Sequence, residues 1–249
     1  MRVIVGLIAL LVATSPASAA EIKTLITTAM EAAIVELVPP FERATGHKVT
    51  VSYDPSGGLA RRLRNGEFAD MILIASSELD KLIGEGKVKD RTDVSRTGIA
   101  LAVRKGAPHP DVSTPEALKR ALIAAKSIGH TAPAGGGITA LHIQKVFERL
   151  GIAEQLAPKI TLAAGGPNGR VSVLVASGKA DIGLQQLSEL SSNPDVEVIG
   201  LLPDELQQIT INSAGITAIA KEPDVARALV NQLTSPEALA LYKTKGLGL

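Results

Sequence analysis

Short apolar runs alternate with amphipathic segments along most of the chain. Apolar runs of strand length cover residues 22–26, 49–53 and Met71–Ala75. Between the first two, apolar residues recur at helical spacing over Glu31–Thr45, and Gly46 follows where glycine commonly ends a helix. Residues 59–64 and 78–85 also read as helices. This strand–helix–strand order predicts a parallel sheet with helices on both faces.

The alternation continues in the second half of the chain. The predicted strands there are 98–103, 127–130, 159–162, 180–184 and 196–200. The predicted helices are 115–125, 138–150 and 169–177. A long extended run at 210–220 and two helices, 223–233 and 237–246, complete the pattern.

Two α/β lobes are the simplest arrangement of these elements. We expect lobe 1 to comprise residues 21–97 plus 214–249 and lobe 2 to comprise residues 98–213. Paired hinge strands near 95–100 and 209–215 would connect them, and the last two helices would pack back on lobe 1. A cleft between two such lobes is a common place for a ligand.

The first twenty residues are typical of a cleavable secretory signal. Arg2 precedes the apolar run 3–13, and the small triplet 17–19 gives an Ala-x-Ala pattern that predicts cleavage before Ala20 or Glu21. The run is shorter than the roughly 20 apolar residues that a transmembrane anchor needs. We therefore expect a periplasmic protein.

Composition narrows the range of functions. Loss of residues 1–20 would leave 25 basic residues against 25 acidic ones, because Arg2 is the one charged residue removed from the 26 basic and 25 acidic of the whole chain. A neutral chain with interspersed charges and 2% aromatic residues argues against a nucleic-acid partner. The absence of cysteine excludes disulfides and zinc ribbons.

Four loops of small residues each join a predicted strand to a predicted helix: 27–29, 56–58, 134–137 and 165–169. Unpaired N–H groups at a helix start, together with the helix dipole, favour an anion. One such loop usually serves only its turn, but four at the same sheet edge, two from each lobe, indicate a shared anion site. The candidate ligand-binding residues in these loops are Thr27, Thr28, Ser56, Gly57, Gly58, Gly136, Gly137, Asn168 and Gly169.

Two further side chains are candidates for the same cleft. Arg170 could clamp a carboxylate through two hydrogen bonds or simply cover the surface of its helix, and both alternatives stay open. Gln185 and Gln186 end a strand at the ligand edge, so at least one amide should point into the cleft; we select Gln186. Arg61 and Arg62 are expected to pair with Asp70 or Glu67 on the protein surface.

Catalytic and metal-binding patterns are poor in this chain. The four histidines are scattered, without metal-ligand spacing, and no serine nucleophile elbow or phosphate-binding Walker loop is present. Asp70 and Asp181 lie at the amino ends of strands and read as loop-capping acids. With no acid or histidine visible at the predicted cleft edge, we expect no catalytic residue, no metal and no cofactor.

Four stretches resemble one family: SGGLARRLRNGEFADMILIAS, PAGGGITALHIQKVFERLGI, NGRVSVLVASGKADIGLQQLSEL and SPEALALYKTKGLGL. They are similar to the molybdate-binding type of periplasmic substrate-binding protein, over nearly all of the chain after the signal. The resemblance implies a type II periplasmic-binding-protein fold, in which each lobe is a mixed, mainly parallel sheet flanked by helices. It also implies a tetrahedral anion held by neutral donors from both lobes.

Carried over residue by residue, the resemblance matches the family only in part. The serine of the family's second loop falls on Ser56, and its backbone donors fall on Gly136 and near Asn168. The first-loop serine is Ala29 here, next to Thr28, and the binding tyrosine is Gln186. The changed donors leave the ligand open between an oxyanion and a small organic acid.

These inferences predict a monomeric periplasmic solute-binding protein. It would capture a small anion by hinge closure and present it to the membrane permease of an ATP-driven (ABC-type) importer. Two alternatives stay open: an isomerase-type enzyme acting on an organic acid in the same cleft, and a ligand-sensing module.

Overall fold

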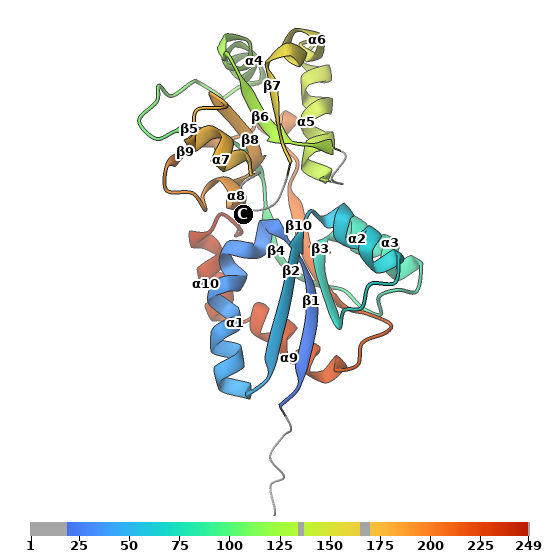
Figure 1. The fold of residues 1–249 in the computed structure, drawn as a ribbon. Coiled ribbons are helices and arrows are strands. Elements are labelled where there is room, and N and C mark those ends of the chain that lie inside the picture. Colours follow the sequence, from blue (N-terminus) through green and yellow to red (C-terminus); the bar gives the residue numbers. More distant parts are fainter. Residues whose placement is uncertain (1–18, 134–136, 165–169, 249) are drawn as a thin grey trace, which may run out of the picture.

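Two five-stranded sheets form two lobes that lie end to end in the computed structural model, which describes residues 19–133, 137–164 and 170–248 (Figure 1). Each sheet is mixed and flanked by helices, as the sequence predicts. The predicted signal segment lies outside the described residues except for its last two. Within the described ranges, no helix is long and apolar enough to cross a membrane.

The sheet of the first lobe has the strand order β2-β1-β3-β10-β4. Its strands are β1 (Glu21–Thr27), β2 (Lys48–Asp54), β3 (Met71–Ala75), β4 (Thr92–Thr97) and β10 (Thr210–Ile216). Strand β1 pairs in parallel with β2 and β3, whereas β10 is antiparallel to β3 and β4. The three parallel strands therefore bring their carboxyl ends to one edge, which faces the second lobe (Figure 1).

Helices cover both faces of this sheet because its inner strands β1 and β3 bury apolar residues on both sides. On one face, α1 (Glu31–Thr45), α9 (Pro223–Leu233) and α10 (Pro236–Thr244) bury residues such as Phe41, Leu229 and Tyr242 in one cluster. On the other face, α2 (Ser56–Arg64) and α3 (Ser76–Gly84) bury Leu59 and Leu79. The C-terminal helices thus pack on the first lobe, as expected from the sequence.

The sheet of the second lobe repeats this plan with the order β7-β6-β8-β5-β9. Its strands are β5 (Ile99–Arg104), β6 (Ile128–Thr131), β7 (Ile160–Ala163), β8 (Ile182–Gln186) and β9 (Val196–Leu201). Its helices are α4 (Pro115–Ala124), α5 (Ile138–Arg149), α6 (Ala153–Leu156), α7 (Val171–Ala176) and α8 (Leu187–Leu190). Strand β6 is parallel to β7 and β8, so these three again end at one edge.

The chain passes between the sheets twice, from β4 to β5 at Gly98 and from β9 to β10 over residues 202–209. The side-chain amide of Gln207 ties the two passages together: its Oε1 accepts from Ile99 N (2.8 Å) and its Nε2 donates to Ile99 O (2.9 Å). A Cβ on Gly98 would lie 3.2 Å from Gln207 Nε2. We propose these two passages as the lobe boundaries and the hinge.

Several elements differ from the sequence-based expectation. Helix α2 begins at Ser56 instead of residue 59, and β8 continues to Gln186 instead of residue 184, because its last residues pair with β5. The extended run ends at Ile216 instead of residue 220. Among the strands and α-helices of the described residues, three were not predicted: the polar edge strand β4 and the four-residue helices α6 and α8.

Candidate functional site

A cavity of about 350 Å³ lies between the lobes, where the carboxyl ends of both sheets meet. From the first lobe it is lined by the ends of β1 and β2 and the starts of the helices that follow them. From the second lobe it is lined by the ends of β6 and β8 and the starts of α5, α7 and α8. This is the edge at which α/β sheets commonly bind ligands.

The structure brings six of the predicted ligand-binding residues together in the wall of this cavity: Thr27, Thr28, Ser56, Gly137, Arg170 and Gln186. Gly57 and Gly58 belong to the first turn of α2 but do not line it. A Cβ on Gly58 would lie 2.9 Å from Asp54 Oδ2, so glycine there makes room for a carboxylate of the protein itself. Gly136, Asn168 and Gly169 lie outside the described residues.

Ser56 and Thr27 form a short chain of hydroxyls at the first-lobe side of the cavity. Ser56 Oγ accepts from Ala75 N (3.0 Å) and donates to Thr27 Oγ1 (3.2 Å). Because Thr27 accepts this bond, its own hydroxyl hydrogen is available to a ligand. Both side chains are buried, which fixes their geometry before any ligand arrives.

Glutamine amides and threonine hydroxyls line the second-lobe side. Gln185 Nε2 donates to Thr131 Oγ1 (2.5 Å), and Gln186 Nε2 donates to Thr139 Oγ1 (3.0 Å) and Thr210 Oγ1 (3.4 Å). Both amides line the cavity. From the alternation of side chains along a strand, the sequence analysis expected at least one of them to point into the cleft. Gln186 Oε1 is buried and has no hydrogen-bond partner among the described residues, so it can accept a hydrogen bond from a ligand.

Arg170 lies at the start of α7 and reaches across the cleft to the first lobe. Its Nη2 donates to Oε2 of Glu31, the first residue of α1, at 2.5 Å. Both side chains line the cavity and are partly buried. The guanidinium is thus in the cleft wall, paired with a carboxylate of the other lobe.

Glu189 contributes a second carboxyl at this junction. Its Oε1 accepts a hydrogen bond from Thr28 Oγ1 (3.1 Å), which is a second link between the lobes. Burial raises the pKa of Glu189 to about 7, with a further increase from Glu31, against the opposing effects of the Thr28 hydrogen bond and the Arg170 charge. A carboxyl with this pKa can both give and take a proton near neutral pH.

The expectation that no acid lies at the cleft edge is wrong. Glu31, Asp54 and Glu189 all line the cavity. Asp54 ends β2, and Glu189 follows the end of β8 by three residues. Ser56 was selected because it follows the carboxyl end of a strand, and the same criterion could have found both acids. Glu31 escaped notice because it lies at the start of the helix after β1, beyond the loop itself.

Tyr53 is a further cavity residue that the sequence analysis missed. It stands one residue before the end of β2. Burial, and secondarily the charge of Glu31, raises the pKa of its phenol. The hydroxyl therefore stays protonated and can donate to a ligand.

Other acids and basic groups singled out from the sequence have structural roles. Asp70 accepts from the backbone N of Lys23 (2.9 Å) and Lys221 (2.8 Å), and Asp181 accepts from Lys126 N (2.9 Å), which confirms both as loop-capping acids. Arg62 pairs with Glu67 at 2.6 Å and not with Asp70.

No cluster of three or more possible metal ligands occurs in the part of the chain that the structure describes. His130 is buried beside Thr131 O (2.9 Å), and His142 contacts Leu206 O (2.8 Å). Each imidazole ring thus has a backbone carbonyl as its partner, and the two histidines share no contact residue in these bonds.

Comparison with known proteins agrees with this architecture. The chain is 36% identical over 251 residues to an aconitate isomerase of a Pseudomonas species, covering 96% of this chain and 93% of that protein. It is 28% identical over 253 residues to the molybdate-binding protein ModA of Azotobacter vinelandii, covering 100% and 97%. The solved structure of the periplasmic molybdate-binding protein of Azotobacter vinelandii superposes with a TM-score of 0.76 at 21% identity, covering 92% of this chain and 99% of that one.

These matches confirm the resemblance to molybdate-binding-type proteins and the type II fold. Residues 22–248 also match the model of a family described as bacterial extracellular solute-binding protein. Since this match spans both lobes, the chain belongs to the bacterial extracellular solute-binding protein family.

Proposed function

We propose that the protein captures a small organic acid with two or more carboxylates in the cleft between its lobes. The observation that carries this proposal is the position of Arg170, the one arginine or lysine among the described residues that line the cavity. A guanidinium binds a carboxylate through two parallel hydrogen bonds. The hydroxyls of Thr27 and Tyr53 would hold a second carboxylate from the opposite lobe.

An organic acid suits this cavity better than a tetrahedral oxyanion. The cavity volume of about 350 Å³ falls in the range of roughly 300–1,000 Å³ that organic ligands occupy. The carboxyls of Glu31, Asp54 and Glu189 would repel a compact dianion at close range, whereas an organic acid can present apolar or protonated groups to them. The relative named aconitate isomerase, at 36% identity against 28% for the molybdate-binding one, supports the same choice.

Titration calorimetry of the purified protein tests this proposal. We expect trans-aconitate or citrate to bind one site per chain with a dissociation constant at least about tenfold below that of molybdate or sulfate. Arg170→Gln should weaken binding of the organic acid by about 1.5–3 kcal/mol, the usual contribution of a hydrogen bond to a charged group. Tight binding of molybdate without measurable binding of either organic acid would contradict the proposal.

Isomerisation of the bound acid is a second candidate function, and Glu189 favours it. Its carboxyl lies in the cavity wall with a pKa of about 7. In its ionised form it would take a proton from the carbon next to the double bond of an unsaturated acid. The double bond would shift by one carbon, and the carboxyl would return the proton to the other end of the three-carbon unit. This proton shift needs no oxidant or cofactor and releases no leaving group.

Proton NMR of cis-aconitate incubated with the protein at pH 7 tests this candidate. Conversion to the trans isomer should occur with the wild type and stop in Glu189→Gln, while binding persists. Glu36→Gln is the matched control, because Glu36, on α1 of the first lobe, pairs with Lys245 at 2.5 Å and does not line this cavity. Conversion that continues in Glu189→Gln would remove Glu189 from this role.

Delivery to a membrane importer completes the proposed function. Ligand contacts from both lobes would stabilise a closed form by bending at Gly98 and residues 202–209, and a permease would recognise that form. We propose a periplasmic location, reached through the signal segment, and a monomeric state. The alternative is that the closed form is presented to a membrane receptor for sensing. Loss of ligand uptake in a deletion strain would favour import over sensing.

A further inference from the structure

The cation of the cavity already has a carboxylate partner from within the protein. Arg170 Nη2 and Glu31 Oε2 are 2.5 Å apart, and they belong to different lobes. Their side chains are 33% and 24% exposed, so their attraction is less screened by water than that of a surface pair. A ligand carboxylate that binds Arg170 at this position must compete with Glu31.

A second cavity of about 410 Å³ lies directly behind this pair. The two cavities share four lining residues, Thr28, Glu31, Arg170 and Glu189, so the Arg170–Glu31 and Thr28–Glu189 contacts form the partition between them. The second cavity is polar: Lys245, which pairs at 2.5 Å with Glu36 of the same cavity wall, and the hydroxyl residue Ser188 line it, and Ser188 Oγ is buried without a hydrogen-bond partner among the described residues. It offers space and donors to a displaced glutamate.

We propose that Glu31 is a built-in competitor of the ligand, whose carboxylate a ligand carboxylate replaces on Arg170 while Glu31 turns toward the second cavity. This inference rests on the proposed binding of an organic acid. A one-for-one exchange keeps the partly buried guanidinium paired throughout, which avoids the cost of an unpaired charge. It also selects for a carboxylate, because only a group that can replace the Glu31 carboxylate on the guanidinium is accepted.

Titration with trans-aconitate of Glu31→Gln and Asp54→Asn tests the exchange. Both substitutions remove one carboxylate from the same cavity, but Asp54 pairs with Arg62 at 3.7 Å, whereas Glu31 pairs with Arg170. Glu31→Gln should lower the dissociation constant by about tenfold, the equivalent of one hydrogen bond to a charged group. Asp54→Asn should lower it by less than about threefold, as expected for screened charge repulsion alone.

The same two substitutions in an Arg170→Gln background separate the pair from a general charge effect. Without the guanidinium, Glu31→Gln should change the affinity no more than Asp54→Asn does. An effect of Glu31→Gln that equals that of Asp54→Asn in the wild-type background, or a loss of affinity, overturns the inference. The melting temperature of each variant checks that it is folded.

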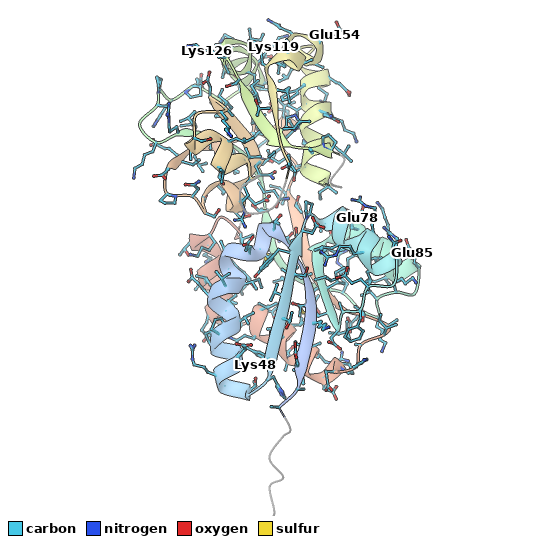
Figure 2. All side chains as sticks on the ribbon, in the orientation of Figure 1. Lys48, Glu78, Glu85, Lys119, Lys126 and Glu154 are labelled. Carbon is cyan, nitrogen blue, oxygen red and sulfur yellow. The ribbon has the colours of Figure 1, made fainter. Side chains whose placement is uncertain are left out.

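A wild type that binds neither trans-aconitate nor citrate would contradict the proposed function. The inference is then tested without a ligand, by measuring whether the Arg170–Glu31 pair holds the two lobes together. The chain has no cysteine, so Glu85→Cys and Glu154→Cys give two unique spin-label sites. Both side chains are exposed, and Figure 2 shows them on different lobes. Without added acid, Glu31→Gln should broaden or lengthen the distance distribution relative to the Asp54→Asn control. An unchanged distribution overturns the inference.

Discussion

Single residues determine the chemistry of this cleft, and three carboxyl groups set it apart from a cage of neutral donors. Glu31 and Glu189 each make a contact to the opposite lobe, through Arg170 and Thr28 respectively. Hydroxyls and amides still supply most of the polar lining, as expected from the strand–helix loops. The cleft therefore combines donors for an anion with groups that can accept a proton.

The sequence predicted part of this site. Thr28, Ser56 and Gln186 were found because residues at the carboxyl ends of parallel strands share one edge. Glu189 was missed because it lies three residues beyond the end of β8, in the four-residue helix α8 that the sequence pattern did not predict. The Arg170–Glu31 pair joins residues 139 positions apart, and no local pattern contains such information.

The raised pKa of Glu189 makes the stability of the protein dependent on pH. Its pKa is about 7 in the folded protein against an ordinary value of 4.5, so the folded state holds the proton more tightly than the unfolded state. The resulting stabilisation is complete below about pH 4.5 and is lost as the pH rises to about 7. Glu189→Gln cannot ionise and avoids this loss.

Urea unfolding at pH 5 and pH 8 measures this effect. The free energy of unfolding of Glu189→Gln, relative to the wild type, should increase between the two pH values by on the order of 3 kcal/mol. Glu154→Gln, which removes an exposed carboxyl of the second lobe, serves as the control. Parallel pH profiles for Glu189→Gln and the wild type would show that the carboxyl is not held in a protonated form.

At the scale of elements, strongly patterned segments were predicted well and polar or short ones were not. Helices α1 and α9 and strand β3 have the predicted bounds, because each has an apolar face or run and clear end signals. Strand β4, with the sequence TDVSRT, buries only Val94 and Thr97 and carries charges typical of an edge strand. Its strand character comes from pairing with β10 instead of from composition.

The packing of α7 on β8 positions Arg170, and Gly183 makes this packing close. A Cβ on Gly183 would lie 2.6 Å from Val175 Cγ2 and 2.9 Å from Val171 Cγ1, both on α7. Gly183→Ala should therefore push α7 away from the sheet and lower the free energy of unfolding by about 1–3 kcal/mol. It should also weaken ligand binding, because Arg170 directly precedes this helix.

Chemical denaturation and calorimetry of the same samples check this prediction against Gly84→Ala. A Cβ on Gly84, at the end of α3, would meet nothing within 4 Å, so this variant should be at least as stable as the wild type. If Gly183→Ala matched Gly84→Ala in both stability and affinity, the proposed link between α7 packing and Arg170 would fail.

At the scale of the whole molecule, the two lobes meet along the edges where their parallel strands end (Figure 1). The repeated strand–helix pattern predicted two α/β lobes, since it occurs once on each side of Gly98. What the pattern could not supply is the contact between them. Thr28 reaches Glu189 and Arg170 reaches Glu31 through side chains that belong to separate sheets.

A crystal structure of the protein with trans-aconitate tests most directly whether both lobes hold one organic acid. The account predicts the acid in the cavity between the lobes, with one carboxylate on Arg170 in place of Glu31 and another on the hydroxyls of Thr27 or Tyr53. An acid bound to one lobe alone, or elsewhere with the Arg170–Glu31 pair intact, would contradict it.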